Sequence, residues 1–315
     1  MRYALVVIAL CGCDTDVPAG CEPIVGAPID ARGEVHRFVV DTIRIPASFT
    51  EALQLGRDID RDPQGRPDNA LGMTLSLIRT RLDTDLNAET AALIDAGKLL
   101  HLLEVRATSL GDAAHVGALL FHGVDTDGDP ADNFSGDETF GIDGSRGIGL
   151  TSGAIADGVL DLTSGTFPIA VTFPGLGEPF VIELVAGWID GDITADGLSG
   201  RLGGAVTVDE LDRALIPALV EGLNRIIARD CPDGTCESGS GGELLVDYFD
   251  DCGEGSSTCD GLLSVDELRS NDLVSSLLAP DMDLFDEAGQ LNPRCDQVKD
   301  ALSIGLGFTA VPARF

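Results

Sequence analysis

The chain has 315 residues, of which 53 are Asp or Glu and 20 are Lys or Arg, so that its formal net charge is −33. A surface this acidic repels nucleic acid and anionic lipid and attracts divalent cations, which excludes DNA and RNA as partners. The length allows one large domain or two, and a hydrophobic fraction of 44% is typical of a folded chain.

The N-terminus carries a short apolar run, Ala4–Leu10, which suits a compact signal peptide. The run ends in Leu10-Cys11-Gly12-Cys13, which resembles the lipobox of bacterial lipoproteins. The resemblance implies that residues 1–12 are removed and that a lipid on Cys13 anchors the protein in the bacterial cell envelope, at the outer membrane or the periplasmic face. A plainly cleaved signal, with Cys13 in a disulfide, is the alternative. Residues 13–32, which are rich in Pro and Gly, are predicted to form a tether.

Residues 33–207 are predicted to form a β-rich domain with two short helices. Apolar and polar residues alternate over 167–173 and 180–188, as in antiparallel strands, whereas 71–82 and 88–100 have helical spacing. Several short strands with one apolar face predict an α+β protein, built on an antiparallel β-sandwich or open barrel with added helices.

Residues 208–315 are predicted to be a helical region that includes an EF-hand-like helix–loop–helix and a closing strand. Thr207 and Glu210 form a capping box before a long helix, which Pro217 is expected to kink or split. Apolar residues alternate again over 304–308, which indicates the closing strand.

The first acidic cluster lies between the first strand and the first helix of the β-rich domain. Asp58, Asp60 and Asp62 stand at alternate positions, and Gly65 and Asp68 follow. Carboxylates with this spacing can wrap a tight loop around one hard cation. The cluster resembles the calcium-binding repeats of thrombospondin type 3 and dockerin-like modules, which implies a Ca²⁺ site. A solvated acidic turn is the alternative.

A second and denser acidic cluster follows a predicted strand. Its candidate ligands are Asp125, Asp127, Asp129, Asp132 and Asp137. So many like charges repel one another in the absence of a cation, and a bound divalent ion removes that penalty. The sequence therefore predicts a second Ca²⁺ loop here.

The third cluster resembles the second half of an EF-hand. The residue types follow the order of that loop: a carboxylate, a turn Gly, an apolar residue, a hydroxyl and a final Glu. Two further acids lie upstream of a short insert. The resemblance implies Ca²⁺ ligands at Asp250, Asp251, Asp260, Ser264 and Glu267. Alternatively, Ser264 and Glu267 only cap the following helix. A fourth, more degenerate acidic turn offers Asp281 and Asp283, or it binds nothing.

Six cysteines remain after the signal and the lipobox, and cysteine usage of this kind indicates an oxidising compartment. Short spacing favours Cys231 with Cys236 and Cys252 with Cys259, which leaves Cys21 for Cys295. A zinc site built on Cys231 and Cys236 is the rival interpretation, although neither short pair has CxxC spacing.

Common catalytic motifs are absent from the sequence: it contains no His-Glu-x-x-His, no Gly-x-Ser-x-Gly, no Walker loop and no dinucleotide fingerprint. His36, His101, His115 and His122 occur singly in or beside predicted strands and are expected to be structural.

The sequence thus favours a non-catalytic, lipid-anchored envelope protein that binds Ca²⁺ through Asp-rich loops in a structural, adhesion or scaffolding role. Its expected partners are the membrane, through the lipid on Cys13, and a protein or surface polymer. The alternatives are a surface hydrolase or carbohydrate-binding module with structural calcium, and a salt-adapted protein whose acidic loops bind no metal.

Overall fold

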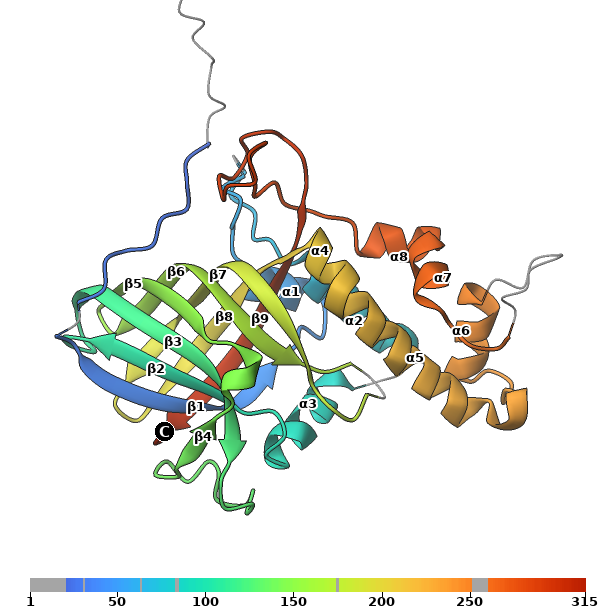
Figure 1. Cartoon of the computed structure of the whole chain (residues 1–315), viewed down its shortest axis with the longest axis horizontal. Helices are drawn as coiled ribbons and strands as arrows, with labels where there is room; N and C mark the ends of the chain where they lie inside the picture. The colour runs from blue at the N-terminus through green and yellow to red at the C-terminus, as the bar shows by residue number, and fades with distance from the viewer. Residues whose placement is uncertain (1–20, 31, 63, 83–84, 174–175, 251–259) are drawn as a thin grey trace, which may run out of the picture.

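The fold is an antiparallel β-barrel, in a computed structural model that describes residues 21–30, 32–62, 64–82, 85–173, 176–250 and 260–315. The strands are β1 (Glu34–Arg44), β2 (His101–Ala107), β3 (Ala113–Asp125), β4 (Phe140–Ile142), β5 (Gly149–Ala156), β6 (Val159–Val171), β7 (Phe180–Thr194), β8 (Gly197–Thr207) and β9 (Ala301–Pro312). Eight of them follow the order β2-β1-β9-β8-β7-β6-β5-β3, and β3 pairs back with β2, so that the sheet closes (Figure 1). β4 pairs with the C-terminal end of β3 and is not part of the closed ring.

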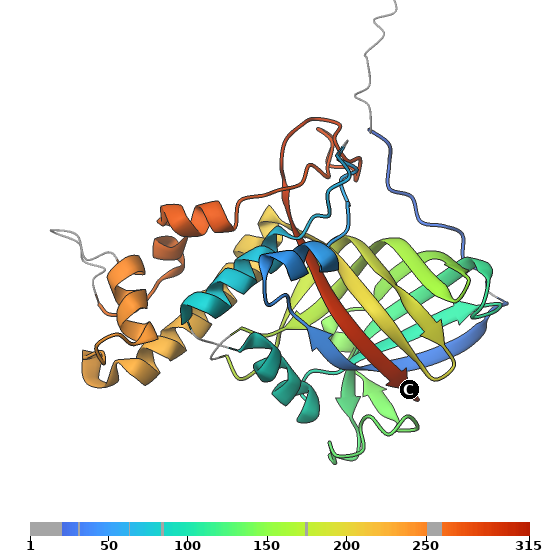
Figure 2. The same ribbon diagram turned by 180° about the vertical axis from the view of Figure 1, so that it is seen from behind.

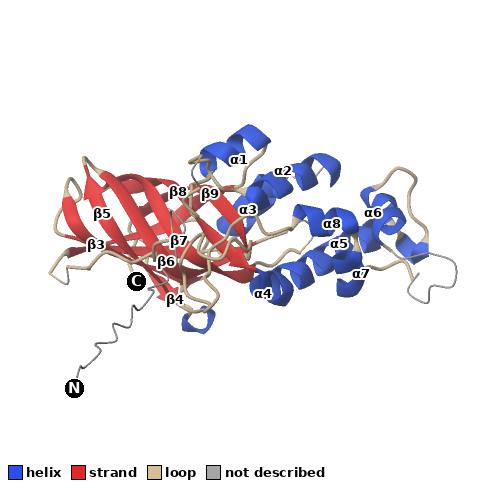
Figure 3. Cartoon of the chain, turned by 90° about the horizontal axis from the view of Figure 1, so that it is seen from above, coloured by secondary structure: helices blue, strands red, loops and turns tan. Residues whose placement is uncertain are grey.

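The helices gather beside one end of the barrel, as Figure 3 shows. They are α1 (Phe49–Leu55), α2 (Ala70–Leu82), α3 (Leu86–Asp95), α4 (Val208–Glu210), α5 (Ile216–Asp230), α6 (Gly241–Phe249), α7 (Val265–Ser270) and α8 (Asp272–Leu277). The chain entering α2 is fastened to the outside of β9, because the Asn69 amide donates to the Gly305 carbonyl at 2.9 Å and the Ala70 N–H donates to the Ser303 hydroxyl at 2.7 Å (Figure 2). None of the helices in the described part of the chain has the length and hydrophobicity needed to span a lipid bilayer.

Apolar side chains from all eight ring strands form one buried cluster. Representative members, each at most 4% exposed, are Phe38, Leu103, Leu120, Ile155, Leu162, Leu184, Leu202 and Leu306. Alternate residues of a strand point to the same face of a sheet, so a closed sheet collects one set of apolar side chains inside. A second apolar cluster, which includes Trp188 and Ala205, is covered by loops (see below).

The expected fold class is wrong in two respects. The sheet is neither a sandwich nor an open barrel, because β9 inserts between β1 and β8 and closes the ring. The C-terminal region is also not an EF-hand-like unit, because it ends in β9, which forms ten register pairs with β8, Leu198–Thr207. The apolar alternation at 304–308 marks only the middle of this strand. Its backbone N–H and C=O groups need hydrogen-bond partners, and the neighbouring strands supply them.

One helical prediction also needs correction. The helix expected over 88–100 ends at Asp95, because Gly97 adopts a left-handed φ of 68° and terminates it before β2 begins. The long helix after Thr207 contains a π-helical turn at Leu211–Leu215 immediately before Pro217. A π turn places the proline in the first turn of the next helical segment, where a missing N–H costs little.

Candidate metal centre

Three loops meet on the outer face of the barrel, and they are called here the loop cap: residues 21–30, 56–62 with 64–69, and 279–300. Cys21 is joined to Cys295 by a disulfide. Arg61 Nη1 donates to the Glu22 carbonyl at 3.3 Å, and Arg294 Nη1 donates to the Arg61 carbonyl at 3.2 Å. Figure 1 shows the loops before α2 and before β9 side by side at the top of the view, with the N-terminal segment running from there along the barrel.

A buried apolar cluster fixes the loop cap to the barrel. Each loop contributes to it, through Ile24, Ile59, Met282 and Leu284, and these side chains pack with Trp188 of β7. Met282 and Leu284 are completely buried. The polar loops therefore rest on a defined apolar base rather than projecting freely into solvent.

The loop of residues 56–69 brings three of the predicted ligands together. Asp58, Asp60 and Asp68, called here the carboxylate triad, each place one carboxylate oxygen within 4.8 Å of the others. All three side chains are partly buried. The base of the loop is closed by the Asp68 N–H, which donates to the Arg57 carbonyl at 2.9 Å.

The backbone of the loop is wrapped around these carboxylates. The Asp62 N–H lies 2.9 Å from Asp58 Oδ1 and 3.1 Å from Asp60 Oδ1 and donates to both, and the Ile59 N–H donates to Asp68 Oδ2 at 2.8 Å. Asp62 itself is not in the triad, because its carboxylate accepts from the Gln64 N–H at 2.7 Å. Alternate Asp residues thus form consecutive side-chain-to-backbone turns, as their spacing predicts.

Burial and mutual repulsion disfavour the charged form of the triad. Burial raises the pKa of Asp68 to about 7, and the nearby carboxylates of Asp60, Asp281 and Asp58 also raise it. Burial, and then the charge of Asp58, likewise raises the pKa of Asp60. A cation beside these oxygens would favour ionisation and lower both pKa values.

The donor set of the triad fits a hard cation. Three carboxylates supply up to six oxygens, and Ca²⁺ takes six to eight oxygen ligands, whereas zinc and copper prefer nitrogen or sulfur. The residues present therefore suit Ca²⁺. A cation bound by the three carboxylates would hold the loop closed.

The second acidic cluster is only partly assembled. Asp127 and Asp132 lie with Glu138 in a carboxylate group, but both aspartates are exposed. The other three predicted ligands serve the local backbone or a hydroxyl: Asp125 accepts from the Asp127 and Gly128 N–H groups, Asp129 from the Ala131 N–H, and Asp137 from the Ser135 hydroxyl.

The third cluster acts as a helix cap in the described residues. Ser264 and Glu267 form a reciprocal capping box at the start of α7. Asp260 Oδ1 accepts from the Leu262 N–H at 3.0 Å, and Asp250 Oδ2 accepts from the Gly261 N–H at 2.8 Å. Asp251 lies outside the described residues.

The fourth turn divides its two acids. Asp281 accepts from the Ser303 N–H at 2.8 Å and from the Ser303 hydroxyl at 2.6 Å, which ties it to β9 beside the triad. Asp283 is only 6% exposed, and burial raises its pKa. Its Oδ1 has no hydrogen-bond partner among the described residues.

Two of the three expected cysteine pairs form disulfides, Cys21–Cys295 and Cys231–Cys236. The third expected pair, Cys252 with Cys259, lies outside the described residues, as does the lipobox Cys13.

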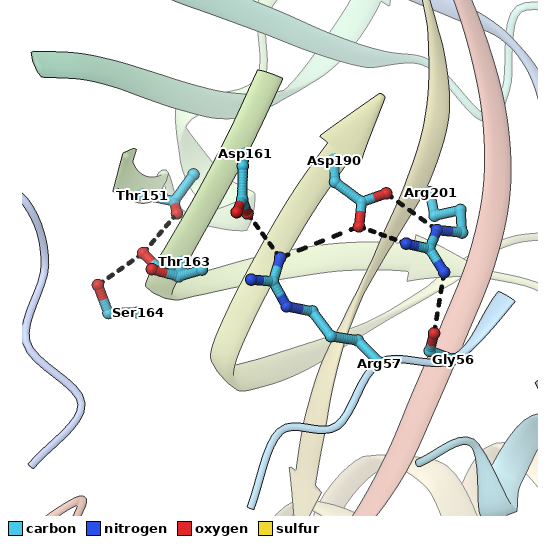
Figure 4. A network of polar contacts seen from close by, with 8 residues as sticks. All are labelled: Gly56, Arg57, Thr151, Asp161, Thr163, Ser164, Asp190 and Arg201. Carbon is cyan, nitrogen blue, oxygen red and sulfur yellow. Dashed lines mark hydrogen bonds and ion pairs between the residues drawn. The ribbon is translucent and has the colours of Figure 1, made fainter. Parts of the chain in front are cut away.

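An ionic network that was not predicted from the sequence lies beside the triad (Figure 4). Arg57 Nη1 lies 2.7 Å from Asp161 and 3.9 Å from Asp190, and Asp190 also pairs with Arg201 Nη2 at 2.7 Å. Both guanidinium groups lie over the ring of Trp188, at 5.8 Å and 5.6 Å from its centroid. No local sequence pattern connects these residues, because they come from the 56–69 loop and three strands.

Two of the histidines form a buried pair that was not predicted from the sequence. His101 of β2 and His122 of β3 face each other in register, with ring centroids 5.4 Å apart. Each is 2% exposed. Burial lowers the pKa of His101 to about 3 and that of His122 to about 4, so both rings are neutral in the folded protein at neutral pH.

Comparison with protein-family models, with curated proteins and with solved structures yields no match to this chain.

Proposed function

We propose that this chain is a calcium-binding, non-catalytic protein of the bacterial cell envelope, anchored through a lipid on Cys13. In this proposal the barrel is the rigid body and the loop cap is its calcium-stabilised surface. The cap acts in adhesion or scaffolding toward a protein or surface polymer.

The observation that carries the proposal is the carboxylate triad, with oxygens of Asp58, Asp60 and Asp68 within 4.8 Å of one another in a partly buried loop. Burial raises the pKa of Asp68 to about 7, so ionisation there is unfavourable unless a positive charge is close. Ca²⁺ supplies that charge, and extracellular modules of this kind bind it at roughly 10⁻⁴–10⁻³ M.

The role of the ion follows from the position of the loop. Residues 56–69 contact both other segments of the cap, through Arg61 with Glu22 and Arg61 with Arg294. A cation that fastens this loop therefore also orders its two neighbours. Calcium in the medium would then set whether the cap presents one surface to a partner.

Terbium luminescence tests the site directly, because Tb³⁺ replaces Ca²⁺ at oxygen-rich sites. Asp60→Asn is expected to weaken Tb³⁺ and Ca²⁺ binding at least about tenfold, since it removes one charge from the triad. Asp129→Asn is the matched control: it removes the same charge from an exposed loop outside the triad. Equal titrations of the wild type and Asp60→Asn would reject the site.

The envelope anchor is tested separately. Labelling with a fatty-acid analogue in a bacterial host is expected to mark the wild type and not Cys13→Ser. Labelling of both proteins, or of neither, would reject lipidation at Cys13 without bearing on the triad.

A further inference from the structure

A small pocket opens beside the carboxylate triad, beneath the N-terminal segment of the loop cap. Ile24 and Val25 cover it, β6 and β7 form its wall, and Arg57, Asp58 and Arg61 line one side. Its volume of about 140 Å³ is close to that of an engineered protein cavity of about 150 Å³ that holds one benzene ring. The pocket therefore has room for one six-membered ring.

One residue of the pocket lining, Trp188, has a buried donor without an acceptor. Trp188 is 1% exposed, and within the described residues its Nε1–H has no hydrogen-bond partner. A buried N–H that is left unpaired costs free energy, so such groups usually mark a ligand or a water position. The guanidinium groups of Arg57 and Arg201 both lie over the indole ring and help to keep it in place.

The wall of the pocket is built from two unusual backbone positions. Ser164 has a φ of 59° and Ala186 a φ of 46°, and both line the pocket although neither is a glycine. The register of β6 with β7 shifts between Leu162 and Gly165, and that of β7 with β8 shifts between Val185 and Trp188. Left-handed non-glycine residues cost free energy and concentrate at binding sites, where bulges redirect side chains.

The polar groups of the pocket select the chemistry of a ligand. The arginines of the lining donate, whereas the Asp58 carboxylate accepts. The Ser164 hydroxyl donates to the Thr163 carbonyl at 2.6 Å, so its own oxygen remains able to accept (Figure 4). An anion would be repelled by Asp58, a cation by Arg57 and Arg61, and a hydrocarbon would leave these charged groups without polar partners.

We infer that this pocket binds a small neutral polyhydroxy compound, a single sugar ring or a comparable polyol. Hydroxyl groups both donate and accept, which matches the mixture of donors and acceptors around Trp188. The network of Arg57 with Asp161 and Asp190 holds one side of the site, and the segment with Ile24 and Val25 covers the apolar face of the ring. This activity goes beyond the proposed calcium-dependent role and does not require the cation.

Fluorescence titration provides the test, because Trp188 is the single tryptophan of the chain. Glucose, galactose, mannose, N-acetylglucosamine and glycerol are added in turn to the full-length protein, with sodium acetate as the charged probe. A saturable change in emission with at least one of the sugars, and none with acetate, is expected. No saturable change with any sugar, or saturation by acetate alone, overturns the inference.

Two variants assign the response to the pocket. Ser164→Gly keeps the left-handed backbone but removes the hydroxyl, and is expected to weaken sugar binding about tenfold. Asp157→Gly is its matched control, because Asp157 also has a left-handed φ, of 51°, but does not line the pocket. Trp188→Phe, followed by calorimetry, is expected to lose binding while it keeps the packing. Wild-type affinity in both Ser164→Gly and Trp188→Phe would contradict the assignment.

Asp68→Asn separates this inference from the calcium proposal. Asp68 belongs to the carboxylate triad but does not line the pocket. The variant is expected to lose Tb³⁺ binding and to keep the response to sugar. Loss of the sugar response in a folded Asp68→Asn protein would show that the pocket depends on the cation and contradict the independence stated here.

Discussion

At the scale of single residues, Asp68 connects the carboxylate triad to stability. Burial raises its pKa to about 7 from an ordinary value of 3.8, so the folded protein favours the protonated acid. The stability that this group contributes is complete below its unfolded pKa and is lost as the pH rises through about 7. Calcium requires the ionised form and therefore opposes this loss.

This titration predicts how the stability of the protein depends on pH when a chelator removes calcium. Between about pH 5 and pH 8, the wild type is expected to lose about 1–2 kcal/mol of stability through Asp68, after allowance for solvent screening of a partly exposed group. Asp68→Asn should reduce this dependence of the free energy of unfolding on pH, and excess Ca²⁺ should reduce it in the wild type only. Urea unfolding at several pH values measures the free energy of unfolding. Identical slopes for wild type and variant in chelator would count against the raised pKa.

The buried histidine pair has the opposite pH dependence. The pKa of His101 is lowered to about 3, first by burial, then by the neighbouring His122 and by Arg146. Burial and Arg146 also lower the pKa of His122, and the charge of Asp143 partly offsets them. A neutral buried histidine gives stability that is present above its unfolded pKa of about 6.5 and is lost as the pH falls toward the folded value.

Acid unfolding tests this second titration. Near pH 4, His101 alone is expected to destabilise the wild type by about 3 kcal/mol, because its unfolded form is protonated and its folded form is not. His101→Gln keeps an acceptor for the Ala170 N–H, which donates to His101 Nε2 at 3.0 Å, and removes the titrating ring. It should move the acid midpoint to lower pH. An unchanged midpoint would show that other groups control acid unfolding.

Sequence spacing was informative only where neighbours in space are neighbours in the chain. Asp58, Asp60 and Asp68 meet because all three belong to one short loop, and the triad therefore followed from the sequence. Asp281 approaches Asp68 only because β9 brings Ser303 next to the chain that enters α2. The pocket around Trp188 depends on Ser164 and Ala186, whose left-handed backbone no sequence pattern announces.

At the scale of elements, the Cys21–Cys295 disulfide controls the N-terminal segment of the loop cap. The bond joins residues separated by 274 positions, so it removes a large loop-closure entropy from the unfolded chain. Within the folded chain it holds that segment beside Leu291, whose carbonyl accepts from the Ile24 N–H at 3.3 Å. The cover of the Trp188 pocket therefore depends on this bond.

Cys21→Ser with Cys295→Ser is expected to destabilise the protein by about 4–5 kcal/mol. It should also increase hydrogen exchange in residues 22–30 while the barrel strands stay protected. The matched control is Cys231→Ser with Cys236→Ser, because that bond closes a separation of only 5 and lies away from the cap. Equal effects of the two double variants would contradict the role given to the longer bond.

Some boundaries of helices and strands follow from the local sequence pattern, and others depend on single residues. The alternation over 167–173 in β6 and the apolar spacing of α2 follow from periodicity. In β7 the alternation changes face at the left-handed Ala186, so that Leu184 lies in the barrel core and Trp188 lies under the loop cap. The end of α3 depends on the single left-handed Gly97, and the split helix after Thr207 depends on a π turn that relieves Pro217. The EF-hand-like order at Ser264 and Glu267 proves to be a capping box, since the same residue types serve both purposes.

At the scale of the whole molecule, closure of the barrel is the feature that periodicity could not reveal. Alternation predicts an antiparallel sheet, but the ring closes through pairs such as Phe38 with Pro312, between the first and last strands. Nothing local in either strand identifies its partner. Closure pairs the edges of the sheet, so the loop cap and the helices are the surfaces that remain available for contacts with a partner.

The net charge of −33 would give a bound calcium ion a further effect at this scale. Each Ca²⁺ would neutralise part of the self-repulsion of the folded state, and a site held at 100 times its Kd would add about 2.7 kcal/mol of stability. For a chain of 315 residues, such a gain corresponds to a rise in Tm of about 4 °C.

The most direct measurement is the Tm of the full chain at neutral pH, in about 10 mM Ca²⁺ and in chelator, for the wild type, Asp60→Asn and Asp129→Asn. The account predicts that Ca²⁺ raises the Tm of the wild type and of Asp129→Asn by about 2–4 °C and that of Asp60→Asn by less than half as much. Superimposable melting curves of the wild type in Ca²⁺ and in chelator would contradict it.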